Sequence, residues 1–273
     1  MSIKELLNRD VEVANIETPS RKEAIIGFLV GFVGYMYVLP IVFMKIFIMV
    51  FKLSSESPTE VIEKYSLLAQ VLSGVVILLI MIFVISFKKI KNVIKNIDGK
   101  TFTLGIKYFL ISYVCVLIWN LLYTLLGGSM GDNANQEGLN NMFKNTPFLT
   151  SMLTCIIAPL IEEMIFRYYM YKGIEDQNPI VAVFLTAFLF AFIHLFASIG
   201  EGTFLQDLKT FPNYFIPSLI LTFAYYKHRK LGVSIVCHMT NNIFATVMMF
   251  LQQFMSNPGN GEIVEEVIRC LLG

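Results

Sequence analysis

The chain has 273 residues, of which 56% are hydrophobic and only 15% are charged, and its mean hydropathy is +0.66. A soluble domain carries about 25% charged residues, so this composition excludes an ordinary water-soluble protein. A charged side chain at the centre of a bilayer costs about 2.5–3.5 kcal/mol on insertion scales. The low fraction of charged residues is therefore typical of a membrane-embedded chain. The net charge of +1 gives no indication of a nucleic-acid partner, and none is expected.

Apolar segments of about 20 residues, the length that crosses about 30 Å of hydrocarbon, recur along the chain. Seven segments meet or approach this length: Ala24–Phe51, Leu67–Phe87, Tyr108–Leu126, Phe148–Tyr171, Ile180–Ile199, Pro212–Tyr226 and Gly232–Phe254. The sixth is short and contains Pro212 and Pro217, so we expect it to be tilted, kinked or packed inside the bundle. The sequence therefore predicts an all-α, polytopic transmembrane helix bundle with about seven spans.

The distribution of positive charge predicts the orientation. The first apolar segment begins late and is too long for the core of a signal peptide, so it is interpreted as a retained span. If the N-terminus is inside, the inner segments hold thirteen Lys and Arg and the outer segments five. This asymmetry predicts a multi-pass protein of the plasma membrane with a cytoplasmic N-terminus and, given seven spans, an outer C-terminus. The segment Ile263–Leu272 is amphipathic and too short to span, and is expected to lie along an interface.

The remaining features point to no second domain and no disulfide framework. The four cysteines, which form no CxxC pair, are interpreted as small buried hydrophobes: Cys115, Cys155, Cys237 and Cys270. The polar segment Gly127–Pro147 predicts a flexible outer loop, and it lacks the flanking strand and the GKS/T sequence of a phosphate-binding loop.

Ionisable side chains within spans are rare and are functional-site candidates by default. The fourth segment carries Glu162-Glu163-Met-Ile-Phe-Arg167. Glu163 and Arg167 share a helix face in the order that favours an ion pair. Glu162 is rotated by about 100°, so the pattern predicts one carboxylate neutralised by arginine and one left free for acid or base work. The alternative is a charge cluster that faces water at the membrane boundary.

The fifth and seventh segments carry two of the three histidines of the chain. Phe190 and His194 share one helix face, and His238 and Asn242 share another. For each pair taken alone, hydrogen bonding between helices is the favoured explanation. Helix rise places Glu162 and His238 about 15 and 10 Å from the inner edge but His194 about 21 Å from it. A common site therefore requires helix tilt or a different helix start.

Three motifs occur in order on successive apolar segments: EExxxR, FxxxH and HxxxN, which read here EEMIFR, FAFIH and HMTNN. Together they resemble the signature of the CPBP family, also called the Abi family, which is similar to the Ras-converting CAAX endoprotease and includes bacterial bacteriocin-processing and self-immunity proteins. The resemblance implies a division into residues 1–147, with three spans and no motif, residues 148–254, a catalytic core of four spans, and the C-terminal tail 255–273.

The resemblance also implies roles for the motif residues. Glu162 would be the base that activates water, and His194 would help to hold or polarise it. His238 and Asn242 would donate hydrogen bonds to the developing oxyanion, where one donor is worth about 3–4 kcal/mol. The remaining motif residues would give structural support: Glu163, Arg167 and Phe190.

A metal is the open question of this chemistry. The sequence lacks HExxH, which would place two zinc ligands and a base on one helix. A zinc set drawn from Glu162, Glu163, His194 and His238 is the alternative, but it competes with the oxyanion role of His238. A metal-independent glutamate mechanism without a cofactor is therefore favoured.

The favoured function is an intramembrane endopeptidase that hydrolyses a membrane-associated or small secreted peptide or protein, with the lipid bilayer as its surroundings. The Ile-, Lys- and Asn-rich composition hints at a low-GC bacterium, for which leader peptides, pheromones or bacteriocins are more natural substrates than prenylated proteins. The alternative is a non-catalytic immunity or regulatory protein that binds a peptide or a sensor kinase. A transporter ranks last, because the first three spans contain no counterpart of EExxxR.

Overall fold

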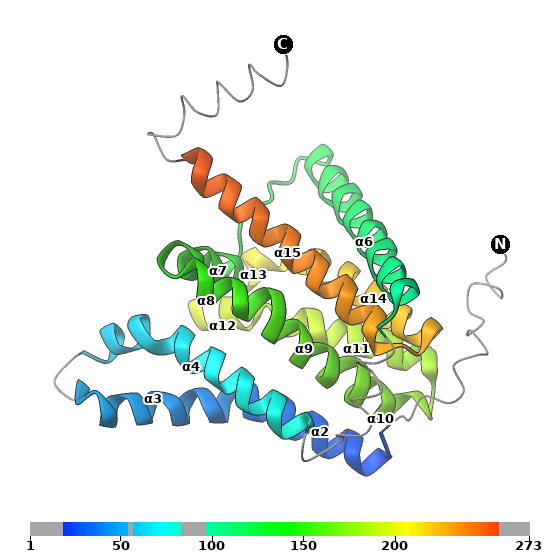
Figure 1. Cartoon of the computed structure of the whole chain (residues 1–273). Helices are drawn as coiled ribbons and strands as arrows, with labels where there is room; N and C mark the ends of the chain where they lie inside the picture. Colours follow the sequence, from blue (N-terminus) through cyan, green and yellow to red (C-terminus); the bar gives the residue numbers. More distant parts are fainter. Residues whose placement is uncertain (1–18, 54–56, 83–96, 257–273) are drawn as a thin grey trace.

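The computed structural model describes residues 19–53, 57–82 and 97–256, which form an all-α bundle without strands (Figure 1). Each of the seven predicted apolar segments contains one or more helices where it is described. The first three are α2 (Arg21–Val33), continued by the π-helical η2 (Gly34–Val38) and α3 (Leu39–Val50), then α4 (Pro58–Ile80) and α6 (Gly99–Leu125). The fourth comprises α8 (Pro147–Met152), π-helical η5 (Leu153–Ile157), α9 (Ala158–Glu163), π-helical η6 (Met164–Met170) and α10 (Tyr171–Glu175). The last three are α11 (Pro179–Ile193), α14 (Phe211–His228) and α15 (Leu231–Ser256).

A membrane helix bundle is confirmed by the length and apolarity of these helices. Four of the described helices can cross a membrane by length and composition: Arg21–Val50, Gly99–Leu125, Pro147–Glu175 and Leu231–Met255. Two shorter apolar helices, Lys64–Ile80 and Pro179–Ile193, accompany them. The total of about seven spans stays a prediction. The end of the predicted segment Leu67–Phe87, the amphipathic segment Ile263–Leu272 and Cys270 lie outside the described residues.

Two helices begin well before their apolar runs because polar residues cap them. Ser57 Oγ accepts a hydrogen bond from Glu60 N (3.3 Å), and Asp98 Oδ1 accepts one from Thr101 N (2.7 Å). Such caps satisfy backbone N–H groups that have no partner in the first helical turn. Hydropathy alone therefore places the starts of α4 and α6 too late.

Two sequence predictions are wrong. The segment Ile180–Ile199 is not one helix, because α11 ends at Ile193 and the chain bends before the short helix α12 (Phe196–Glu201). The polar segment Gly127–Pro147 is not simply a loop, because α7 (Ala134–Asn145) occupies most of it. Asn133 begins α7 by accepting a hydrogen bond from Gln136 N (2.9 Å), and Ala134 and Phe143 are buried, so a capped and partly apolar helix forms within a mostly polar sequence.

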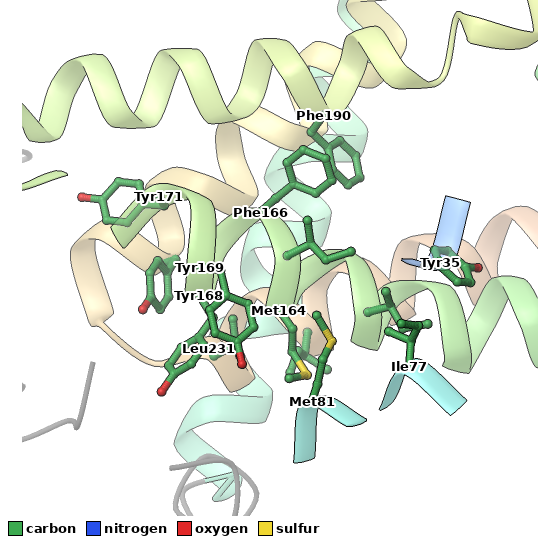
Figure 2. Packing of buried hydrophobic residues seen from close by; sticks show 14 of the residues in the cluster. Tyr35, Ile77, Met81, Met164, Phe166, Tyr168, Tyr169, Tyr171, Phe190 and Leu231 are labelled. Atoms are coloured by element: carbon green, nitrogen blue, oxygen red, sulfur yellow. The ribbon is translucent and has the colours of Figure 1, made fainter. Parts of the chain in front are cut away.

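The fourth segment is the centre of the bundle. Every residue from Met164 to Tyr169 in η6 is buried, so this stretch is covered on all sides. Side chains from the first two segments, including Tyr35, Ile77 and Met81, belong to the same buried cluster (Figure 2). The stretch Met164–Tyr169, which contains Arg167 of the EExxxR motif, is thereby shielded from lipid, and the first segments form part of its enclosure.

Gly105 sets the distance between α6 and α15. A Cβ atom there would lie 2.5 Å from Val236 Cγ1 and 3.1 Å from the Cys237 backbone nitrogen, whereas one at Gly138 in α7 would meet nothing within 4 Å. We expect Gly105→Ala to destabilise the protein by about 1–3 kcal/mol through overpacking. Gly138→Ala should instead be neutral or stabilise by about 0.5–1 kcal/mol. Thermal unfolding of both variants in detergent measures the difference, and equal stability would contradict this packing.

Candidate active site

Proline shapes the backbone around the two glutamates. Each of the π-helical segments η2 and η5 ends two residues before a proline, Pro40 and Pro159 respectively. A widened turn relieves the clash of a proline ring with the carbonyl of the preceding turn. Glu162 and Glu163 lie at the end of α9, between η5 and η6, in a helix whose geometry departs from regular α on both sides.

Glu163 and Arg167 form the predicted ion pair, and both side chains are completely buried. Arg167 Nη1 donates to Glu163 Oε1 (3.0 Å), while Nη2 donates to Ser218 Oγ (2.8 Å) and to the Ser218 carbonyl (3.2 Å) of α14. The guanidinium also lies 4.4 Å from the centre of the Phe190 ring, a cation–π contact. The pair therefore ties the central helix to α11 and α14.

Glu163 has a second partner that the sequence analysis missed. His238 Nδ1 lies 2.7 Å from the same Oε1 atom that binds Arg167. A carboxylate on one ring nitrogen fixes the orientation of an imidazole. The contact links α15 to the central helix, so no spacing within either helix predicts it. Glu163 thus directs the other ring nitrogen, Nε2, away from itself.

The neighbouring Glu162 has a different environment. Its Oε2 atom lies 3.7 Å from His238 Nε2, too far for a direct hydrogen bond. Arg167 donates to Glu163, and none of its hydrogen bonds goes to Glu162. Glu163 is therefore paired with Arg167, as the spacing of the motif predicts, whereas Glu162 lies beside the imidazole of another helix.

His194 is the C-cap residue of α11, and its tautomer follows from its contacts. Nδ1 lies 2.8 Å from the Phe190 carbonyl, which can only accept, so Nδ1 carries the hydrogen. In the neutral ring Nε2 then presents a lone pair. The ring stacks on Tyr214 of α14, with centroids 4.7 Å apart. This packing sets the plane of the imidazole at the point where the helix ends.

Asn242 is held by the backbone of the central helix. Its Nδ2 atom donates to the Thr154 carbonyl (2.8 Å) in η5. This carbonyl lacks a helical donor, because the Ala158 N–H binds Leu153 and Pro159 has no N–H. Because Pro159 lacks an N–H, the Thr154 carbonyl is free to accept the hydrogen bond that anchors the Asn242 amide. The second N–H of this amide can donate to another acceptor.

The predicted catalytic residues lie around one cavity of about 600 Å³. Its lining includes all four of them: Glu162, His194, His238 and Asn242. Phe190 also lines it, and its ring contacts those of both histidines, with centroid distances of 4.8 Å to His194 and 5.7 Å to His238. Because His194 sits at the very end of its helix beside Tyr214, counting rise along a straight span misjudges its position.

Helix α7 covers one end of this cavity through polar contacts that the sequence did not reveal. Asn133 Nδ2 donates to Thr210 Oγ1 (2.7 Å), and Asn135 Nδ2 donates to Tyr214 Oη (3.3 Å). The Ala134 N–H donates to Asp207 in α13 (Phe204–Asp207) at 3.2 Å. Burial alone would raise the pKa of Asp207, but hydrogen bonds, foremost those from Ser198 and Thr203, hold that pKa below its usual range. Tyr214 therefore connects α7 to His194.

The zinc set considered from the sequence does not fit the donors. Glu163 Oε1 is taken by Arg167 and by His238 Nδ1. Within the described ranges, no group of three or more His, Cys, Asp or Glu side chains is arranged to hold a metal ion. The metal requirement stays open to experiment.

Comparison with known proteins finds relatives among membrane proteases. A family model described as Type II CAAX prenyl endopeptidase Rce1-like matches residues 144–244. The chain is 29% identical over 173 residues to the UPF0177 protein YxdF of Lactococcus lactis, covering 62% of this chain and 89% of that protein. It is 31% identical over 117 residues to YbdJ of the same organism, covering 42% of this chain and 46% of YbdJ.

Another relative is named as a protease. The chain is 26% identical over 157 residues to the membrane-embedded CAAX protease MroQ of Staphylococcus aureus, covering 54% of this chain and 59% of MroQ. The chain thus spans less than two thirds of MroQ and of YbdJ. No solved structure matches the chain significantly.

Proposed function

This chain belongs to the CPBP family of membrane-embedded CAAX proteases, and from this premise we propose that it is an intramembrane endopeptidase that hydrolyses peptide bonds with water activated by Glu162. The observation that carries the proposal is that Glu162, His194 and His238 line one cavity while Arg167 neutralises the neighbouring Glu163. A carboxylate in an enclosed site that is not neutralised by arginine can act as a general base.

The chemistry follows from the groups present. Glu162 accepts a proton from water while the water oxygen attacks the carbonyl carbon of the substrate. The His194 Nε2 lone pair accepts the second hydrogen of this water and orients it. His238, whose ring Glu163 holds through Nδ1, donates from Nε2 to the oxyanion together with Asn242. The tetrahedral intermediate then collapses, the C–N bond breaks, and protonated Glu162 supplies the proton to the leaving amine.

We propose a membrane-associated or small secreted peptide as the substrate, including a leader peptide, pheromone or bacteriocin, because the composition hints at a low-GC bacterium. We place the protein in the plasma membrane with a cytoplasmic N-terminus, on the basis of its Lys and Arg distribution. No metal or other cofactor takes part in the proposed steps.

The proposal is tested with purified protein in detergent and a mixed peptide library analysed by mass spectrometry. Wild type and Glu162→Gln are compared, each with and without a chelator. We expect cleavage by wild type that is lost in Glu162→Gln and kept with chelator. Loss with chelator and recovery with zinc would refute the metal-free mechanism. A non-catalytic immunity or regulatory protein would cleave nothing and would retain its cellular phenotype in Glu162→Gln.

A further inference from the structure

Two residues hold the imidazole ring of His194, and they constrain it in different ways. The Phe190 carbonyl binds Nδ1 at 2.8 Å, and within the described ranges the structure gives His194 no other hydrogen bond. One anchored atom does not fix the plane of a ring. The Phe190 ring meets the imidazole at 45°, whereas the Tyr214 ring lies nearly parallel to it, at 23° with centroids 4.7 Å apart. Tyr214 is therefore the residue that covers a face of the imidazole.

The plane of this ring matters for the proposed reaction. His194 and Glu162 line the same cavity, and the His194 Nε2 lone pair is the group that orients the attacking water in the proposed steps. Nε2 lies across the ring from Nδ1, so it shifts when the ring turns about its anchored atom. A displacement of about 1 Å at the reacting groups can cost about 100-fold in rate. A side chain that fixes the ring plane therefore affects catalysis without touching the water.

Tyr214 is itself held in place by α7. Its Oη atom donates to Asn133 Oδ1 (3.2 Å) and accepts a hydrogen bond from Asn135 Nδ2 (3.3 Å). Asn133 is buried, caps α7 through Gln136 N (2.9 Å) and donates from Nδ2 to Thr210 Oγ1 (2.7 Å). A buried network whose members all have partners is rigid. The packing of α7 over the cavity is thereby linked to the position of the Tyr214 ring.

We infer that Tyr214 is a positioning residue of the active site, which holds the His194 ring so that Nε2 faces the attacking water, and that α7 supports it through Asn133 and Asn135. This inference rests on the proposed endopeptidase function and adds a residue that lies outside the three motifs. Tyr214 acts through His194 and takes part in no bond that forms or breaks. Helix α7, which lies between the third and fourth apolar segments, thus supports catalysis as well as covering the cavity.

Three variants of α14 test the inference on a peptide that wild type cleaves. Tyr214→Leu removes the ring and should lower kcat by about 10–100-fold with little change in KM, because the lost contact acts on the reacting groups. Tyr214→Phe keeps the stacked ring but loses both hydrogen bonds to α7, so kcat should stay within about fivefold of wild type. Phe215→Leu is the matched control, because Phe215 stacks on Phe211 (5.5 Å) outside the cavity lining, and it should leave kcat unchanged.

The kinetic outcomes that contradict the inference are distinct. A higher KM at unchanged kcat in Tyr214→Leu would show that the ring binds substrate instead of placing His194. A loss in Tyr214→Phe as large as in Tyr214→Leu would show that stacking is not what matters. An equal loss in Phe215→Leu would trace the effect to general destabilisation, which thermal unfolding of all three variants measures independently.

A spectroscopic measurement separates this inference from the proposed function. The three histidines of the chain are labelled with ¹³C in their rings in Glu162→Gln, and the His194 signals are identified by their absence in His194→Gln. Protons over the face of an aromatic ring are shielded by its π electrons. Tyr214→Leu should therefore move the His194 ring signals downfield, whereas Tyr214→Phe and Phe215→Leu should keep them in place.

This spectroscopic result supports the placement of His194 by Tyr214 even if wild type cleaves nothing, an outcome that would refute the proposed function alone. His194 signals that do not respond to the loss of the Tyr214 ring would overturn the inference, whatever the activity of the wild-type protein.

Discussion

Glu163→Gln is expected to lower the free energy of unfolding by about 3–5 kcal/mol, the usual cost of removing one partner from a buried ion pair. Arg167 and Glu163 are both 0% exposed, so the guanidinium cannot turn to water when its carboxylate is lost. His238 also loses the carboxylate that holds Nδ1 at 2.7 Å. The variant should therefore lose activity together with stability, because the orientation of the histidine ring depends on the same oxygen atom.

Asp176→Asn is the matched control for this prediction. Lys172 and Asp176 form an ion pair with the same spacing of four residues, at 2.8 Å, but the Asp176 side chain is 66% exposed. An exposed pair of this type contributes about 0.3–0.5 kcal/mol, so its loss should scarcely change stability. Reversible unfolding in mixed micelles measures both variants. If Glu163→Gln proves as mild as Asp176→Asn, the buried pair is not the structural support described above.

Glu162→Gln is expected to reduce kcat by about 10²–10⁴-fold, the usual contribution of a general base. Its stability should stay close to that of wild type, because the Glu162 side chain is partly exposed to the cavity and makes no ion pair with Arg167. The two adjacent glutamates thus have different expected phenotypes. Substitution of Glu162 lowers activity but not stability, whereas substitution of Glu163 lowers both.

Glu162→Asp provides a graded variant for this second prediction. Aspartate keeps the carboxylate but withdraws it by one methylene group, so activity should fall less than in Glu162→Gln through misplacement of the water. Initial rates on a cleaved peptide and thermal unfolding in the same detergent give the two readouts. Undiminished hydrolysis in Glu162→Gln would remove this residue as the base. A large drop in melting temperature would instead indicate a structural role.

Apolar runs and residue spacing predict the features that depend on interactions within one helix. The apolar runs predict the helices, because a span must satisfy its own backbone hydrogen bonds and present apolar side chains to lipid. The spacing of Glu163 and Arg167 predicts their ion pair, because residues four apart always share a helix face. Boundaries are predicted less well, since Asp98 caps α6 before its apolar run begins and α11 ends at Ile193 within such a run.

The sequence by itself determined the membrane class, the helical segments and the set of polar residues that a lipid-embedded chain would not carry without a use. Only the tertiary structure decided that His238 binds Glu163, that Pro159 leaves the Thr154 carbonyl to Asn242, and that α7 covers the cavity through Asn133 and Tyr214. The reason is physical: helix periodicity relates residues within one helix, whereas contacts between helices depend on tilt, bends and packing that no single segment encodes.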